Sequence, residues 1–373
     1  MNKKPVVVIG DGWSALGTVG FLVTSGVEVR WIQGAGPRSW APLSCLGYGP
    51  GVSCVMNLVK LLGLECAEWR TGSFIREYRN KSFREPAWVK APSPSIRRDV
   101  QGELLWAPEQ KLVGVFDSCF KVPFTEIEEA IRQKLEGGGF PHLQRFQAVP
   151  VTGVQVDQGC IRSVVLGSGL EIDCEKMIYA DRWGLLYGIE GLPKPLSFMR
   201  NLDPFGALQV TFTHSTAMMP GVLESFLIAL PRESGEKIER HIWGYFSGHR
   251  STWTLCLTQE EVENNHEIAK KFRRLKSSLD RAFSASGAFA ERQMAFLSTL
   301  SQEQVRLSEE FVFSSGKVNL QGETCERVSG ILFLTDAYGP SRAFEQVGAV
   351  LGIETENFDS QSEDLEWVSP HVS

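Results

Sequence analysis

The chain has 373 residues, of which 43% are apolar and 22% charged, and its net charge at pH 7 is −6. This composition is typical of a soluble globular protein with two domains, and the negative charge argues against nucleic acid as the main partner. The eight cysteines and six histidines show no metal-ligand spacing, so we expect no metal site and a reducing, cytoplasmic location. No apolar run reaches about 18 residues, so we expect no integral membrane segment.

The most informative stretch runs from 6 to 32. It reads as a buried strand, a glycine turn, a helical pattern and a second apolar strand. This order over about thirty residues predicts a unit that binds a dinucleotide. In such a unit Gly10 allows the sharp turn, Gly12 lets the backbone approach a pyrophosphate, and Ala15 lets the helix pack closely on the strand.

The helix that follows the turn begins with Trp13 and Ser14. The amide groups at a helix N-terminus have no partner within the helix and attract phosphates, so we expect both residues to lie at the cofactor. Trp13 is an unusual residue for this position, and it is predicted either to shield the site or to block it.

The second strand of such units usually ends in Asp or Glu, whose carboxylate accepts hydrogen bonds from the ribose hydroxyls. Gln33 stands at this position. Its amide oxygen can accept such a bond, but without the negative charge that strengthens it. The sequence therefore predicts that replacing Gln33 by Glu tightens dinucleotide binding.

The remaining elements alternate between helical and strand patterns along the chain. The first of them are a helix from 55 that ends near Gly63, short strand-like pieces between 70 and 115, and a helix that begins at its N-cap Thr125, with a Thr125–Glu128 capping box, and ends at the glycines from 137. A strand meander at 149–180, a strand-rich block at 205–257 and a helix or helical pair at 258–283 with a Thr258–Glu261 capping box follow. The last is a buried strand at 331–334 that ends in Thr335–Asp336 and precedes a helix.

This order of parts resembles the FAD-dependent amine oxidase superfamily, which includes protoporphyrinogen oxidase and the phytoene desaturase-like enzymes. The resemblance implies that Gly10, Gly12 and Ala15 hold the FAD pyrophosphate. It also implies that the Asp336 carboxylate lies near the ribityl–phosphate region of the flavin. The Gly348–Ala349 pair of the last helix corresponds to a pair that approaches the flavin in this family. Arg38 is a loose counterpart of the arginine in the Gly-Gly-Arg signature of the family.

The predicted fold class is α/β, with a Rossmann-like FAD/NAD(P)-binding domain and an inserted substrate domain built from a mixed sheet and helices. The first domain is expected to comprise 1–69, 123–190 and 325–355, and the second 70–122 and 191–324. The acidic segment 356–373 is expected to be a flexible tail.

Two hypotheses about function remain at this point. In the first, the chain is an FAD-dependent oxidoreductase of the amine oxidase type that transfers hydride from a small or apolar substrate to the flavin. In the second, it is a catalytically inactive protein with a flavoprotein fold, in which FAD is lost or weakly bound and the partner is another protein. Gln33 and the incomplete Gly-Gly-Arg signature favour the second hypothesis, whereas the match at both chain ends favours the first.

Overall fold

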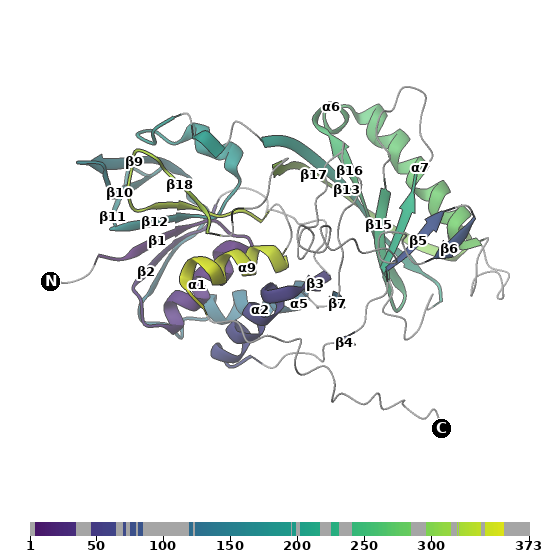
Figure 1. The fold of residues 1–373 in the computed structure, drawn as a ribbon, viewed down its shortest axis with the longest axis horizontal. Coiled ribbons are helices and arrows are strands. Elements are labelled where there is room, and N and C mark those ends of the chain that lie inside the picture. The colour runs from purple at the N-terminus through teal and green to yellow at the C-terminus, as the bar shows by residue number, and fades with distance from the viewer. Residues whose placement is uncertain are drawn as a thin grey trace, which may run out of the picture.

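The larger of the two main units is built on a sheet to which both ends of the chain contribute (Figure 1). Its strand order is β18 (Glu323–Thr324), β19 (Ile331–Phe333), β12 (Lys176–Tyr179), β1 (Val6–Ile9), β2 (Val29–Ile32) and β8 (Leu143–Phe146). All neighbours in this sheet are parallel except β18, which is antiparallel to β19. The first strand and the strand near 331, which the sequence analysis assigned to one domain, thus share one sheet.

The computed structural model describes most of the chain, and every statement below concerns these residues. They are 4–34, 46–64, 70–71, 75–79, 81–84, 119–121, 124–194, 196–198, 202–216, 225–230, 241–284, 296–314, 319, 321–336 and 340–353. Arg38 and the acidic segment 356–373 lie outside them. Among the described helices none is long and apolar enough to cross a membrane.

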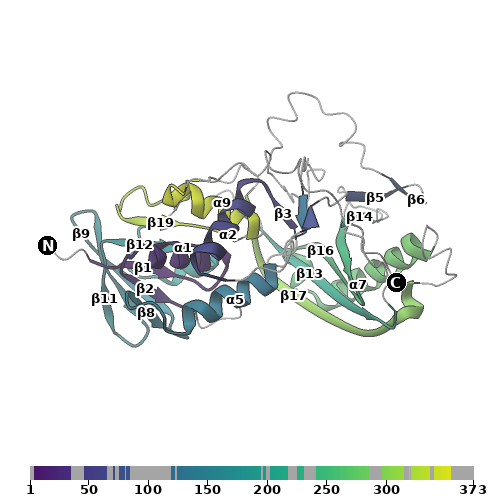
Figure 2. The same ribbon diagram turned by 90° about the horizontal axis from the view of Figure 1, so that it is seen from below.

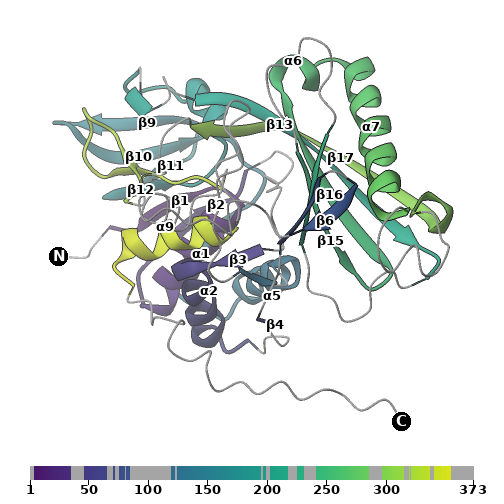
Figure 3. The ribbon, with the colours of Figure 1, turned by 45° about the vertical axis from the view of Figure 1, so that its right-hand side comes forward.

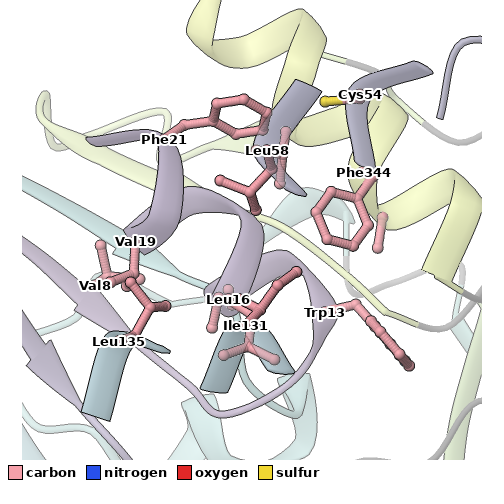
Figure 4. Packing of buried hydrophobic residues seen from close by; sticks show 14 of the residues in the cluster. Val8, Trp13, Leu16, Val19, Phe21, Cys54, Leu58, Ile131, Leu135 and Phe344 are labelled. Carbon is pink, nitrogen blue, oxygen red and sulfur yellow. The ribbon is translucent and has the colours of Figure 1, made fainter. Parts of the chain in front are cut away.

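Helices cover one face of the first sheet. They are α1 (Trp13–Thr24), α2 (Gly49–Leu61), α5 (Phe124–Glu136) and α9 (Pro340–Leu351). Parallel strands buried on both faces are expected to read as apolar runs, as β1 does in the sequence VVVI. Figure 4 shows the side chains of Leu16, Leu58 and Phe344, which come from α1, α2 and α9 and pack in this layer.

The opposite face of the sheet is covered by the meander β9 (Val151–Asp157), β10 (Cys160–Leu166) and β11 (Glu171–Asp173) and by the short helix η1 (Trp183–Gly188). The predicted antiparallel meander is confirmed. The core on this face also contains Leu192 and Leu196, which the sequence analysis assigned to the second domain. Both faces of the first sheet are therefore buried.

The second unit is a seven-stranded sheet with a long helix on one face (Figures 2 and 3). Its strand order is β17 (Leu300–Ser314), β13 (Leu202–His214), β16 (Arg250–Thr258), β15 (His241–Ser247), β14 (Ser225–Ala229), β5 (Ile75–Arg79) and β6 (Ser82–Arg84). The helix α7 (Asn265–Ser284) and the helical turn η3 (Phe296–Thr299) complete an aromatic core around Phe246, Trp253 and Phe283.

The helical pair predicted after 258 is confirmed as the short helix α6 (Gln259–Val262) followed by α7. Its capping box is also present. The amide of Thr258 donates to Glu261 Oε2 at 3.0 Å, and the Glu261 amide donates to Thr258 Oγ1 at 3.3 Å. Besides the meander, a further small sheet is formed by β3 (Leu46–Tyr48), β7 (Cys119–Lys121) and β4 (Arg70–Thr71).

Candidate functional site

The glycine turn between β1 and α1 lies at the carboxyl edge of the first sheet. Gly10 has φ +131°, a conformation that glycine adopts readily and other residues avoid. A Cβ atom on Gly10 would lie 2.2 Å from the carbonyl oxygen of Ala180, at the end of β12. The carbonyl of Gly10 accepts a 2.8 Å hydrogen bond from Trp31 Nε1 on β2. Two neighbouring strands therefore fix this turn, and the Ala180 carbonyl at the end of β12 requires glycine here.

The second glycine of the turn contacts a carboxylate from the other end of the chain. A Cβ atom on Gly12 would lie 1.7 Å from Asp336 Oδ2, so any other residue here would force the Asp336 carboxylate to move. Asp336 Oδ1 accepts a 2.8 Å hydrogen bond from the amide of Ser14, in the first turn of α1. Gly12 itself provides no side-chain cap for α1. The carboxylate that follows β19 therefore caps a helix 322 residues away in the sequence.

Burial raises the pKa of Asp336 to about 6. Desolvation disfavours the charged carboxylate, and the negative charge of Glu128 adds to this effect. Hydrogen bonds from Ser14 and from the Trp13 amide act in the opposite direction, because they stabilise the ionised form. The carboxyl group therefore changes its charge at a pH close to neutrality.

Two further carboxylates follow neighbouring strands of the same sheet. Asp11 follows β1, and Asp181 follows β12. Asp181 Oδ1 accepts a 2.7 Å hydrogen bond from the Arg182 amide, and its Oδ2 lies where a Cβ on Gly34 would be only 2.9 Å away. Burial raises the pKa of Asp181, and the charge of Asp11 contributes to the shift. The carboxyl edge of β1, β12 and β19 is therefore acidic.

Trp13 and Ala15 lie on the inside of the helix layer. Only 4% of Trp13 is exposed, and its ring centroid lies 6.4 Å from that of Phe344 on α9, so it is buried beside α9 (Figure 4). Ala15 is fully buried in the same core. Sequence reasoning missed Gly17, where a Cβ would lie 2.9 Å from the Phe344 ring. This glycine permits the close approach of α1 and α9.

Gly348, the first residue of the predicted Gly348–Ala349 pair, lies against another helix. Gly348 lies toward the end of α9 and faces α2, where its added Cβ would lie 3.1 Å from Cys54 Sγ. Burial raises the pKa of the Cys54 thiol to about 12, so this thiol is unreactive at neutral pH. The structure thus explains Gly348 by contact between two helices.

Gln33 lies at the end of β2, as predicted, but its side chain points to α5. Its Nε2 donates to Glu136 Oε1 at 2.9 Å, and only 5% of the residue is exposed. The α5 residue Arg132, which is 3% exposed, donates to the carboxylate and carbonyl of Asp11 and to Glu128 Oε1 at 3.1 Å. Sequence reasoning missed Arg132 and Glu136. The only local sign was an arginine beside Ile131 in the apolar face of a helix.

Comparison with solved structures identifies the fold. PqsL, a probable FAD-dependent monooxygenase from Pseudomonas aeruginosa, has a TM-score of 0.55 at 16% identity over 93% of this chain and 84% of its own. An oxidoreductase from Methanosarcina mazei has a TM-score of 0.63 at 13% identity over 93% of this chain and 100% of its own. A geranylgeranyl bacteriochlorophyll reductase-like protein from Thermoplasma acidophilum has a TM-score of 0.54 at 12% identity over 94% and 77%.

The chain shares its fold with these three solved structures, one of which is a probable FAD-dependent monooxygenase. The α/β architecture with a Rossmann-like domain and a second sheet domain, as expected from the sequence, is confirmed. The three matched structures are a probable FAD-dependent monooxygenase, an oxidoreductase and a reductase-like protein, and they do not single out the amine oxidase superfamily. No protein-family model and no curated protein sequence matches the chain.

Proposed function

We propose that this protein binds FAD and is an FAD-dependent oxidoreductase. The observation that carries the proposal is the glycine turn at the N-terminus of α1, placed at the carboxyl edge of a parallel sheet and beside Asp181 and Asp336. Ligands of open α/β sheets bind in the crevice at this edge, and helix N-termini suit phosphates. The fold shared with FAD-binding proteins supports FAD over a nicotinamide as the ligand.

The residues present fit such a ligand. Gly12 has no Cβ, and in the FAD-free protein the Asp336 carboxylate fills the space beside it. A pyrophosphate at the turn therefore requires this carboxylate to move aside, where it can accept from flavin ribityl hydroxyls. Trp31 and Ala180 keep the turn rigid from the two neighbouring strands. When bound, FAD supplies hydride transfer, and the protein contributes position, orientation and the exclusion of water.

The substrate is proposed to be a small molecule. The amine oxidase type of reaction, in which a small or apolar substrate itself reduces the flavin, is one form of the proposal. The likeness to a probable monooxygenase supports another form, in which a nicotinamide reduces the flavin first. Anaerobic mixing of the loaded protein with NADH or NADPH separates the two forms, because only the second form predicts that the flavin loses its colour.

The test of FAD binding is titration of the purified protein with FAD and with riboflavin, which lacks the pyrophosphate. FAD is expected to bind, to change its visible spectrum and to raise the melting temperature, because a ligand at about 100 times its Kd stabilises the folded state by about 2.7 kcal/mol. Riboflavin is expected to bind far more weakly. Absence of any spectral change and of any thermal shift with FAD would refute the proposal.

A catalytically inactive binding or scaffold protein is the second candidate. The observation that favours it is that Asp336 already accepts hydrogen bonds from the first amides of α1, and that protein atoms alone explain why Gly10 and Gly12 are glycine. The turn is thus satisfied without a ligand. A protein that is fully folded and does not bind FAD would support this candidate, with a protein as the partner.

A further inference from the structure

Gln33 stands at the end of β2, where the ribose-recognising residue usually lies, but its side chain points to α5. The Gln33 amide donates to the Phe146 carbonyl at 2.8 Å, which fixes the backbone against β8. The side-chain Nε2 of Gln33 is committed to Glu136 Oε1 at 2.9 Å. Because Gln33 is almost completely buried, its amide oxygen is poorly placed to meet a ligand in the crevice.

Glu136 brings a carboxylate to the same place from a different element. It is the last residue of α5, and 32% of its side chain is exposed. One of its oxygens accepts the bond from Gln33, and it lies 3.9 Å from Arg132 Nη1. A carboxylate has about four acceptor positions, so Glu136 retains the capacity to accept from further hydroxyl groups.

The position of Glu136 is unfavourable for the helix alone. A negative charge in the last turn of a helix meets the negative end of the helix dipole, which costs roughly 0.3–1 kcal/mol. Gln33 and Arg132 offset this cost, because the side chains of both lie near Glu136 Oε1, at 2.9 Å and 3.9 Å. The chain thus holds a carboxylate at the end of β2 in a place where helix formation alone would disfavour it.

Arg132 also controls the charge of the glycine turn. Its guanidinium is paired with Asp11, the acidic residue between the two glycines, and with Glu128. Without this cation, Asp11 would repel a pyrophosphate at the turn. Arg132 therefore links the turn to Glu136 in one network of contacts that starts at the phosphate position and ends at the ribose position.

We propose that Glu136, held by Gln33 and Arg132, is the residue that recognises the adenosine ribose of the bound dinucleotide, in place of the acidic residue that usually ends the second strand. The inference rests on the proposed FAD binding and assigns a ribose-recognising group to it. It predicts that the protein distinguishes adenine nucleotides with ribose hydroxyls from those without them.

The experiment measures the affinity of the full-length protein for FAD by flavin fluorescence, and then the displacement of FAD by ADP and by 2′,3′-dideoxy-ADP. In the parent chain ADP is expected to compete at least about tenfold better than the dideoxy compound, as for a hydrogen bond to a charged group. In Glu136→Gln the preference is expected to vanish, with FAD bound about tenfold more weakly. Glu129→Gln is the matched control, since Glu129 is an exposed residue of the same helix whose carboxylate accepts a hydrogen bond from Gln133, one turn further along.

The variant Glu136→Asp withdraws the carboxylate by one methylene and keeps its charge, so it is expected to lose most of the ribose preference as well. Binding of FAD by the parent chain with an unchanged ADP preference in Glu136→Gln would overturn the assignment of Glu136 alone. Equal competition by ADP and the dideoxy compound in the parent chain, or none by either, would also overturn it. Failure of the parent chain to bind FAD would overturn the proposed function together with this inference.

Discussion

Replacing Asp336 by Asn should change how the stability of the FAD-free protein depends on pH. The amide oxygen of Asn can still accept from the Ser14 amide, so the cap on α1 is kept, but the titrating group is lost. Burial raises the pKa of Asp336 from its ordinary value of 3.8 to about 6, and each pH unit corresponds to about 1.4 kcal/mol. The folded protein therefore loses about 3 kcal/mol of stability when this carboxyl ionises.

The sign follows from proton uptake. Because the folded state holds the Asp336 proton more tightly than the unfolded state, this contribution is most favourable below about pH 4 and is lost as the pH rises from about 4 to about 6. Relative to the parent chain, Asp336→Asn should gain about 3 kcal/mol over this range. The assay is urea unfolding of both FAD-free proteins at several pH values, and the difference between them cancels the other titrating groups. Parallel stability curves for the two proteins would refute the reasoning.

Three further predictions concern the glycine turn and its network. Gly10→Ala should lower the free energy of unfolding in urea without FAD by more than about 3 kcal/mol, because its Cβ meets a backbone oxygen. Gly26 is also at positive φ but has open space around it, so Gly26→Ala should lower this free energy by only about 1 kcal/mol. Similar losses would contradict the proposed contact. Arg132→Met should destabilise by about 3 kcal/mol, because it leaves the partly buried carboxylates of Asp11 and Glu128 without their cation. Unchanged urea unfolding would contradict this. Gln33→Glu should weaken FAD binding about tenfold in a flavin titration, because it places a second carboxylate against Glu136, and tighter binding would restore the expectation from the sequence.

The parts of the fold that follow from local patterns could be predicted from the sequence. The apolar runs of β1 and β19 identify them as buried strands, and the alternating strands with glycine turns identify the meander. The capping box of Thr258 and Glu261 predicts the start of α6, because both partners lie within one helical turn. These signals are local, and the structure confirms each of them.

The contacts at the glycine turn depend on residues that are distant in the sequence. Gly12 was interpreted as leaving space for a pyrophosphate, yet the atom closest to its missing Cβ belongs to Asp336. Gly348 was interpreted as a flavin contact, and it packs against Cys54. A glycine shows only that something comes close to the backbone, and the sequence does not say whether that atom belongs to a ligand, a helix or a carboxylate.

The residue expected to recognise the ribose shows the same limit of sequence reasoning, here for a charged group. The motif assigns ribose recognition to the last residue of β2, so Gln33 was interpreted as a lost carboxylate. In the structure Gln33 donates to Glu136, a residue 103 positions later in the chain. A charged acceptor at the end of the strand forms strong hydrogen bonds with ribose hydroxyls, whichever element of the fold supplies it. The presence of glutamine at position 33 therefore argues against dinucleotide binding only if Glu136 is also absent. The FAD affinities of the variants Glu136→Gln and Gln33→Glu test this directly.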